Sequence, residues 1–340
     1  MKEKSSISKK DKPLTIFITG GSSGIGYQAV LKLIFLGHNI ILPCKNIYRA
    51  NEVLTNILNQ SPAKLSKKGE IYTPIMDLSD FKSIDSLCSE LKKKCVNIDV
   101  LILNAGLQYT GSKTPRMSSQ GVELTFAVNH LSHFYLTQKI LPLIDIKNDP
   151  RIIITSSEVH NPNSGGGKVG AKASLGNLKG LESGVGFEMI DGNKFNADKA
   201  YKDSKLCNIL FARKLSNNLI SKKLLIPVIA WAPGLVISKD NLGFFRYSRK
   251  YNQLGQILFA FVARDILRIT TSNKNAGLLL SNLTCLSKYR KPGFNYYSNK
   301  IISSGKFIFE ETDISNEAQA GELSDKLWDL SQSLIDKILS

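Results

Sequence analysis

Short runs of apolar residues alternate along this chain with longer segments in which apolar side chains recur every three or four positions. The apolar runs lie at 14–19, 39–43, 71–76, 99–103 and 151–155, and a helical pattern follows each of them. Continuous apolar runs are typical of strands buried on both faces, and their alternation with helices is typical of a parallel sheet. We therefore predict an α/β fold with a doubly wound parallel sheet of about seven strands and helices on both faces.

The most apolar helical pattern lies late in the chain, at 254–269. It contains Arg264 and Asp265 and is shorter than the roughly 20 residues that a bilayer-spanning helix needs. We expect this segment to form a lid helix over a substrate pocket, and contact with a membrane surface is the alternative.

The first apolar run continues directly into a glycine-rich turn, which is followed by a helical pattern at 25–36. Such a turn lets backbone N–H groups approach a pyrophosphate at the positive end of a helix dipole. A strand before the glycines and a helix after them form the context of a Rossmann-type dinucleotide site. The predicted cofactor contacts in this turn are Gly20, Ser22, Ser23, Gly24, Ile25 and Gly26. A purely structural turn is the competing interpretation.

Three later strand ends extend this predicted site. No acid follows the second strand, where a fold that selects NAD usually places one, and Lys45 offers a cation for a 2′-phosphate instead. We therefore predict NADPH as the cofactor, and a solvated surface lysine is the alternative. Asp77 and Leu78 follow the third strand, and the Asp77 carboxylate is expected either to accept from an adenine amino group or to cap a helix. The fourth strand ends in small residues that would let the chain pass close to the ribose and nicotinamide: Asn104, Ala105 and Gly106.

Tyr201 and Lys205 are four residues apart in a helical pattern, so their side chains are expected on one face. A phenol with an ordinary pKa of about 10 is a poor proton donor at neutral pH. An ammonium group beside the phenol favours the phenolate and lowers that pKa toward the working range. We therefore predict a proton-donating pair, and an ordinary pair on a solvated helix face is the alternative.

Two more polar residues complete a predicted catalytic group. Asn129 lies on an otherwise apolar helix face, where its amide must find partners. It is expected either to order a water molecule near Lys205 or to be a satisfied amide of the core. Ser157 follows the fifth strand and brings a hydroxyl to the carboxyl edge of the sheet, where doubly wound folds bind ligands. His130 and His133 recur three residues apart without a third ligand, so we predict no metal site.

Taken together, the glycine turn, the NAG at 104–106, Asn129, Ser157 and the YxxxK pair resemble the short-chain dehydrogenase/reductase superfamily. A finer resemblance is to the light-dependent protochlorophyllide oxidoreductases. It is carried by YKDSKLCN at 201–208, by MIDGNKF at 189–195 and by a long segment between Ser157 and Tyr201. The C-terminal stretches GFNYYS and KLWDLSQSLI also resemble this family, so the resemblance covers nearly the whole chain.

The resemblance implies one domain at 14–340, with an insertion at 158–198 and a substrate lid region at 237–270. It implies NADPH as hydride donor, Tyr201 as proton donor and Lys205 as its electrostatic partner and a ligand of the nicotinamide ribose. Asn129 would serve as a water relay, and Ser157 would place its hydroxyl near the substrate. Pro233 and Gly234 join the expected cofactor contacts. The implied substrate is a tetrapyrrole pigment that absorbs the light itself.

Some positions depart from the light-dependent family. Leu235 stands where that family usually carries a cysteine, NAGLQ at 104–108 replaces the more usual NAAVY, and the loop 237–251 differs as well, reading DNLGFFRYSRKYN from residue 240. These changes fall where the pigment should sit. Two alternatives therefore stay open: a light-independent carbonyl or retinol-type reductase, which TFAVNHLSHF at 125–134 also resembles, and a non-catalytic protein that binds NADPH or pigment.

Composition adds constraints on size and location. A chain of 340 residues with 42% hydrophobic residues can bury one large core. Five cysteines without a CxxC pair suit a reducing compartment, so we expect a cytoplasmic protein. The formal charge is +17, and residues 1–13 form a basic segment that we predict to be a disordered tail without the apolar core of a secretory signal.

The positive charge bears on the expected partners. It could attract the protein to an anionic photosynthetic membrane as a peripheral protein. No nucleic-acid-binding module is recognisable, so nucleic acid is not an expected partner. The expected partner is therefore a small-molecule substrate, and the pattern makes no prediction about the oligomeric state.

Overall fold

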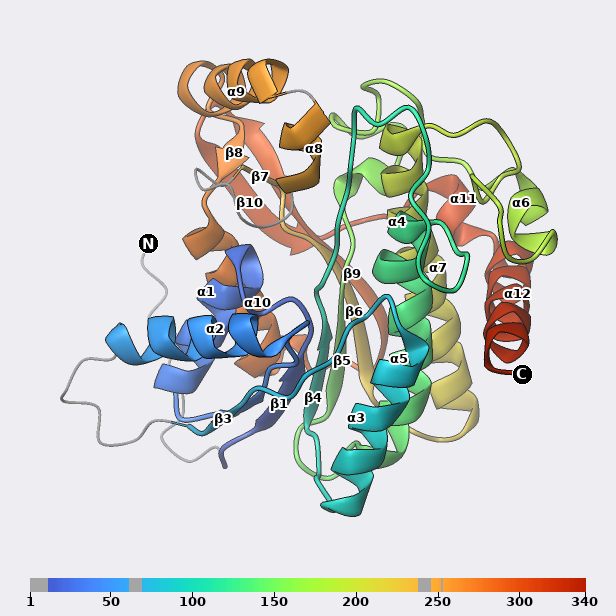
Figure 1. Ribbon diagram of the computed structural model, residues 1–340. Helices are drawn as coiled ribbons and strands as arrows, with labels where there is room; N and C mark the ends of the chain where they lie inside the picture. The colour runs from blue at the N-terminus through green and yellow to red at the C-terminus, as the bar shows by residue number, and fades with distance from the viewer. Residues whose placement is uncertain (1–11, 61–68, 238–245, 252) are drawn as a thin grey trace.

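The computed structural model describes residues 12–60, 69–237, 246–251 and 253–340. Its centre is an eight-stranded sheet with the order β10-β9-β6-β5-β4-β1-β2-β3 (Figure 1). The strands are β1 (Thr15–Ile18), β2 (Asn39–Ile41), β3 (Ile71–Tyr72), β4 (Val100–Leu103), β5 (Arg151–Thr155), β6 (Pro227–Ala232), β9 (Gly293–Ser303) and β10 (Lys306–Glu311).

Seven of these strands run parallel, and β10 pairs antiparallel with β9 at one edge. The predicted doubly wound parallel sheet of about seven strands is therefore confirmed, with one additional edge strand. A separate pair of two-residue strands, β7 (Leu235–Val236) and β8 (Thr270–Thr271), was not predicted. Such short strands carry too few residues to show a period.

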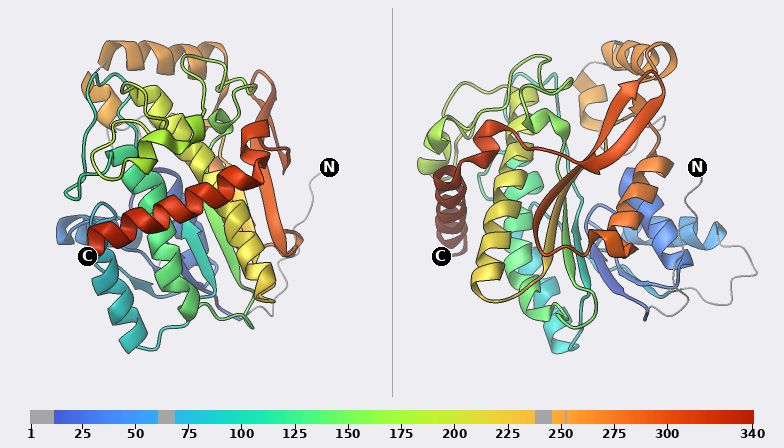
Figure 2. Two further views of the ribbon diagram at one scale, coloured as in Figure 1. Left: turned by 90° about the vertical axis from the view of Figure 1, so that its right-hand side faces the viewer. Right: turned by 180° about the vertical axis from the view of Figure 1, so that it is seen from behind.

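Helices cover both faces of the sheet. The longer ones are α1 (Gly24–Phe35), α2 (Ile47–Asn59), α3 (Phe81–Lys93), α5 (Ser132–Ile140), α7 (Ala197–Ser221), α9 (Gln253–Phe261), α10 (Asn273–Cys285) and α12 (Gly321–Leu339). The shorter ones are α4 (Leu124–Phe126), α6 (Lys179–Glu182), α8 (Arg246–Tyr251) and α11 (Asn316–Gln319). As Figures 1 and 2 show, α1, α2 and α10 lie on one face, α3, α5 and α7 lie on the other, and α12 packs against α7.

The strand period sorts side chains between two core layers. Ile16 and Ile18 of β1 pack in the layer of α1, α2 and α10, whereas Phe17 packs in the layer of α3, α5 and α7. Successive side chains of a strand point to opposite faces, so a strand covered on both sides must be apolar throughout. Fully burying one such side chain contributes about 1.5–3 kcal/mol. The continuous apolar runs of the sequence follow from this arrangement.

Some predicted boundaries differ from the structure. The expected strand at 71–76 is regular only over β3, and Ile75 then makes a single isolated bridge to Cys44. The apolar helix expected at 254–269 is α9 followed by a π-helical turn, η5 (Val262–Ile266). Most of the expected tail at 1–13 lies outside the described residues.

The insertion at 158–198 contains little regular structure. It holds two 3₁₀ turns, η3 (Glu158–His160) and η4 (Gly176–Leu178), and the short helix α6, and otherwise runs as loops. Both its ends meet the same region, because β5 leads into it and α7 leads out of it. The insertion therefore begins at the carboxyl edge of the sheet and ends at the helix that carries Tyr201.

Candidate active site

The turn between β1 and α1 is shaped by glycines that a side chain would disrupt. Gly20 and Gly24 have φ values of +66° and +58°, in the left-handed region that favours glycine. A Cβ on Gly26 would lie 2.3 Å from the carbonyl oxygen of Gly20. The Ser23 side chain does not cap α1, so this helix N-terminus can offer backbone N–H groups to an anion. The turn therefore fits a dinucleotide pyrophosphate, as predicted.

A cavity of about 1520 Å³ opens at the carboxyl ends of the strands. This volume exceeds the roughly 300–1,000 Å³ of a typical small-molecule site, so it has room for a dinucleotide and a second ligand. All of the predicted cofactor contacts line it: Gly20, Ser22, Ser23, Gly24, Ile25, Gly26, Lys45, Asp77, Leu78, Asn104, Ala105, Gly106, Tyr201, Lys205, Pro233 and Gly234. Of the four predicted catalytic residues, Tyr201, Lys205 and Ser157 line the cavity, and Asn129 lies behind its wall.

Lys45 and Asp77 form an ion pair with an Nζ to Oδ2 distance of 2.9 Å. Their side chains are 67% and 30% exposed, so both are accessible to a ligand in the cavity. Burial raises the pKa of Asp77, but hydrogen bonds from Ser79 and Lys45 outweigh it and lower the pKa below its usual value. Lys45 was predicted to bind the 2′-phosphate and Asp77 the adenine amino group. The two side chains lie side by side, and the Asp77 carboxylate partly neutralises the Lys45 charge.

Tyr201 and Lys205 lie on one face of α7, as their spacing predicts. The Lys205 Nζ is 5.7 Å from the centre of the Tyr201 ring and donates to the carbonyl oxygen of Thr155 at 3.1 Å. Burial lowers the pKa of Lys205 to about 7.

The expected pKa shift of the phenol does not occur in the protein alone. Burial raises the pKa of Tyr201 above its ordinary value, and a hydrogen bond with Ser157 only partly offsets this. The expectation of a net lowering by Lys205 is therefore wrong, because the lysine is itself buried and its charge is weakened. A phenol of ordinary pKa is already protonated at neutral pH, so this rise makes release of the proton less favourable in the protein alone.

Asn129 is a satisfied amide in the core. It lies in a π-helical turn, η1 (Ala127–Leu131), between α4 and α5. Its Oδ1 accepts from the backbone N–H of Leu107 at 2.8 Å, and its Nδ2 donates to the Leu107 carbonyl oxygen and to Ser204 Oγ. A Cβ on Gly106 would lie 3.5 Å from both Asn129 Oδ1 and Lys205 Nζ. The glycine thus leaves a gap between these two groups, and a water relay through this gap remains a prediction.

A chain of hydrogen bonds links the strand ends that line the cavity. Asn104 Nδ2 donates to the carbonyl oxygens of Thr19 and Gly20, both at 3.2 Å. Thr155 Oγ1 donates to Asn104 Oδ1 at 3.3 Å and accepts from Trp231 Nε1 at 3.0 Å. The carboxyl ends of β1, β4, β5 and β6 are therefore held to one another, which fixes the floor of the site.

The two histidines of the Asn129 helix serve the core. His133 Nε2 contacts Thr19 Oγ1 at 3.0 Å, and His130 Nε2 contacts Ser331 Oγ at 3.3 Å. Burial lowers the pKa of each to about 3, so both imidazoles are neutral. Within the described parts of the chain, no group of three potential ligands could hold a metal ion.

Several residues of the cavity wall were not singled out from the sequence. Arg49, in the first turn of α2, lines the cavity near Lys45 and pairs with Glu52 at 2.6 Å. Glu158 and Tyr296 also line the cavity. Burial raises the pKa of Glu158 despite a hydrogen bond from the backbone of Gly166. Arg49 could have been found from its place just after the second strand, but Tyr296 lies far along the chain and gave no local signal.

The departures from the light-dependent family also face the cavity. Leu107, Gln108 and Leu235 all line it, as does Tyr247 of α8. Gln256 and Phe259 of α9 line it too, so the segment expected to be a lid borders the same space. Residues 238–245, within the altered stretch, lie outside the described residues.

Comparison with known proteins places these features in context. A family model described as short chain dehydrogenase matches residues 14–174. The protochlorophyllide reductase of Chlamydomonas reinhardtii is 31% identical over 329 residues, which cover 94% of this chain and 77% of that protein. The protochlorophyllide reductase of Cucumis sativus is 30% identical over 328 residues, with the same two shares covered.

Solved structures show the same fold. An uncharacterised protein from Mycobacterium paratuberculosis superposes with a TM-score of 0.66 at 21% identity, covering 95% of this chain and 93% of that one. The L-sorbose reductase of Gluconobacter frateurii, complexed with NADPH and L-sorbose, superposes with a TM-score of 0.58 at 15% identity, covering 88% and 98%. Identities this low establish a common architecture and nothing finer.

Proposed function

Because the chain belongs to the short-chain dehydrogenase family and is a divergent relative of the protochlorophyllide reductases, we propose that it is an NADPH-dependent reductase acting on protochlorophyllide. One observation carries this proposal. The similarity to those reductases extends over 94% of the chain, so it includes the insertion and the C-terminal segments as well as the dinucleotide-binding half. The tetrapyrrole would occupy the part of the cavity beneath the insertion and α9.

In the proposed reaction, bound NADPH would supply a hydride to one carbon of the ring D double bond. Tyr201 would give a proton to the other carbon and would be left as a phenolate. The phenolate left behind would be stabilised by the Lys205 ammonium and by the hydrogen bond with Ser157. Light would be absorbed by the pigment itself.

NADPH rather than NADH is part of the proposal. The glycine turn fits the pyrophosphate, and Lys45 and Arg49 place two cations at the mouth of the cavity beyond β2. No acid directly follows β2 to accept a ribose 2′-hydroxyl, since the next residues are Leu42, Pro43, Cys44 and Lys45. A 2′-phosphate would therefore find charge complementarity at this place.

The proposal is tested by mixing the purified protein with NADPH and protochlorophyllide in darkness and recording absorption spectra before and after brief illumination. We expect a product band only after illumination. Pigment that binds but stays unchanged after light would contradict the photoreductase assignment, and so would a pigment that does not bind at all.

A light-independent reductase is the second candidate, and the cavity wall supplies its support. Leu235 and the pair Leu107 and Gln108 replace residues usual in the light-dependent family at positions that border the ligand. The same mixture kept in darkness, followed by a panel of aldehydes and ketones, separates the two candidates. NADPH oxidation without light would favour this second assignment.

We further propose peripheral contact with an anionic membrane, through the outer surface of α9 and η5. Leu254, Ile257 and Leu258 are 83%, 56% and 64% exposed. The tip of the β9–β10 hairpin lies next to this surface. The Gly305 N–H at the tip donates to the carbonyl oxygen of Arg268, two residues after the end of η5, at 2.9 Å. Among the described residues, no helix is long and apolar enough to cross a membrane. The exposed leucines would instead enter the interface of the bilayer.

Cosedimentation with vesicles of phosphatidylglycerol and phosphatidylcholine tests this contact. We expect Leu258→Asp to weaken binding about tenfold, because burying a leucine contributes about 1.5–3 kcal/mol. Leu225→Asp is the matched control, since Leu225 is 65% exposed but lies before β6, outside this surface. Equal binding of both variants and the wild type would exclude the α9 surface as the contact.

A further inference from the structure

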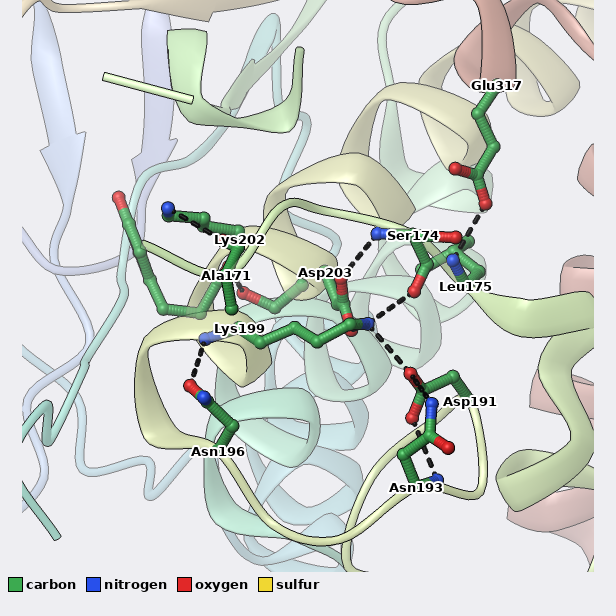
Figure 3. Close-up of polar contacts among 12 residues, drawn as sticks. Ala171, Ser174, Leu175, Asp191, Asn193, Asn196, Lys199, Lys202, Asp203 and Glu317 are labelled. Carbon is green, nitrogen blue, oxygen red and sulfur yellow. Dashed lines mark hydrogen bonds and ion pairs between the residues drawn. The ribbon is translucent and has the colours of Figure 1, made fainter. Parts of the chain in front are cut away.

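A buried ionic cluster joins the insertion to the first turns of α7. The Lys199 Nζ lies 2.5 Å from Asp203 Oδ2 and 2.9 Å from Asp191 Oδ2 (Figure 3). Lys199 and Asp203 belong to α7, whereas Asp191 belongs to the insertion. The three side chains are only 15%, 1% and 3% exposed, so the cluster is removed from solvent.

The polar atoms of this cluster are satisfied by the insertion backbone. Lys199 also donates to the carbonyl oxygen of Ser174 at 2.5 Å, and Asp203 Oδ1 accepts from the Ser174 N–H at 3.0 Å. Asp191 accepts from the backbone and the side chain of Asn193. A buried charge pair is retained at low cost only when its remaining hydrogen bonds are made, and such networks specify one geometry. The insertion is therefore fixed at Ser174 and at Asp191 by the same ammonium group.

Neighbouring contacts hold the same stretch of the insertion. Lys202 donates to the carbonyl oxygens of Val169 and Ala171, the latter at 2.8 Å. Leu175 N–H donates to Glu317 Oε1 of α11 at 2.7 Å. Figure 3 shows Lys202, Ala171, Leu175 and Glu317 beside the Lys199 cluster. Segment 169–175 is thus held at four of its seven residues.

The arrangement has a consequence for the cavity, because the upstream part of the insertion is its wall. Residues 158–161 and 163–166, together with Val169, line the cavity. Tyr201 lies between the two clamp positions on α7, two residues before Asp203 and two after Lys199. Any motion of segment 169–175 relative to α7 would therefore move the wall relative to the Tyr201 hydroxyl.

We propose that Lys199 and Asp203 are positioning residues, which clamp the insertion to the turn of α7 that carries Tyr201 and so hold the substrate side of the cavity in place. The kinetic part of this inference rests on the proposed reductase function. The clamp itself is independent of turnover. Neither residue touches the reacting atoms, and their effect acts through the position of the wall.

Hydrogen exchange of the full-length protein, with and without NADPH, measures the clamp directly. We expect Lys199→Met to speed exchange about tenfold or more in peptides covering 169–175 and 189–193, and also in the wall segment 158–169. Asp203→Asn is the milder variant, because its amide oxygen can still accept from Ser174, and it keeps the test valid if Lys199→Met folds poorly. We expect Lys199→Arg, which keeps the cation, to restore most of the protection.

Lys326→Met is the matched control. Lys326 of α12 also ties down the insertion, through Glu182 at 2.6 Å and the carbonyl oxygen of Asn177 at 2.8 Å, but far from Tyr201 along the chain. We expect this variant to leave exchange in 158–175 unchanged. Unchanged exchange of 169–175 in Lys199→Met would overturn the clamp. Faster exchange that stops short of 158–169 would overturn the positioning role.

Kinetics add a second readout. We expect Lys199→Met and Asp203→Asn to raise the KM for protochlorophyllide about tenfold, with the Kd for NADPH within about twofold of wild type, because the glycine turn is remote from the clamp. If hydrogen exchange is faster but the kinetic constants stay at the wild-type level, the cluster has only a structural role and the positioning role is refuted. Failure of the wild-type protein to use protochlorophyllide would refute the proposed substrate, whereas the exchange results would still decide the clamp.

Discussion

The two halves of the cavity are built by different means. The cofactor half is defined by backbone: strand ends held to one another, and glycines such as Gly20 and Gly26 whose positions leave no room for a side chain. The substrate half is defined by side chains that hold loops, above all the Lys199 cluster. A backbone-defined site tolerates little change, whereas a loop held by a few ion pairs can be altered piece by piece. The departures from the light-dependent family, such as Leu235, line the same cavity.

Tyr201→Phe should have the largest effect, because Tyr201 stands where the two halves meet. We expect turnover to fall about a hundredfold to ten-thousandfold, the usual contribution of a general acid, while NADPH binding is unchanged. Turnover in the assay described above and fluorescence titration with NADPH measure the two quantities. Tyr296→Phe, a buried tyrosine that also lines the cavity, is the control and should lose far less activity. Surviving turnover in Tyr201→Phe would refute the assignment of the proton donor.

Lys205 should make stability depend on pH. Its pKa is about 7 in the fold against an ordinary 10.5, so between these values the unfolded chain binds a proton that the native protein does not. The free energy of unfolding should therefore rise with pH across this window, by up to about 1.4 kcal/mol per pH unit. The cost of the buried charge is present in full below pH 7 and absent above 10.5.

Urea unfolding of the wild type and of Lys205→Met, without NADPH, isolates this contribution. The difference in unfolding free energy between them should increase from pH 7 upward, since methionine cannot titrate. A difference that stays flat would show that Lys205 is solvated and charged in the fold.

Gly26→Ala tests the backbone-defined half. Its Cβ would lie 2.3 Å from the Gly20 carbonyl oxygen and 2.7 Å from Asn104 Nδ2, so the turn must shift. Overpacking of this kind costs about 1–3 kcal/mol, and we expect the Kd for NADPH to rise about tenfold to a hundredfold. Gly321→Ala is the control, because no atom lies within 4 Å of its added Cβ. Equal NADPH binding by the two variants would contradict the role of the turn.

This contrast also explains what could be predicted from the sequence. Five of the seven parallel strands were located as unbroken apolar runs, because strands such as β4 and β5 are buried on both faces. The glycine turn was recognisable because its conformation demands glycine at fixed spacings. Strand β10 was missed because its residues, KFIFEE, mix charged and apolar side chains as an edge strand does.

The clamp could not be predicted, because its members meet only in the fold. Lys199 and Asp203 are visible in the sequence as an ordinary helical pair, but Asp191 and Ser174 come from separate parts of a loop with no periodic pattern. The predicted shift in the pKa of Tyr201 was wrong in direction for the same reason. Its four-residue spacing from Lys205 is local, whereas the burial that raises its pKa depends on the insertion and strands around it.

Lys45→Met should have the smallest effect, because Lys45 lies at the exposed rim of the cofactor half. An ion pair as exposed as Lys45 with Asp77 contributes at most about 1 kcal/mol to stability, so the variant should unfold like the wild type. A charge-assisted hydrogen bond to a phosphate is worth about 1.5–3 kcal/mol, so the Kd for NADPH should rise about tenfold while the weaker binding of NADH stays the same. Titration of both nucleotides gives the ratio. Lys214→Met is the control, because Lys214 lies on α7 outside the cavity lining and pairs with Asp325 of α12. If the ratio of the Kd values for NADPH and NADH is unchanged in Lys45→Met, Lys45 does not select the 2′-phosphate. Arg49, the other cation on this rim, would then be the selecting residue, and Arg49→Met would raise the Kd for NADPH.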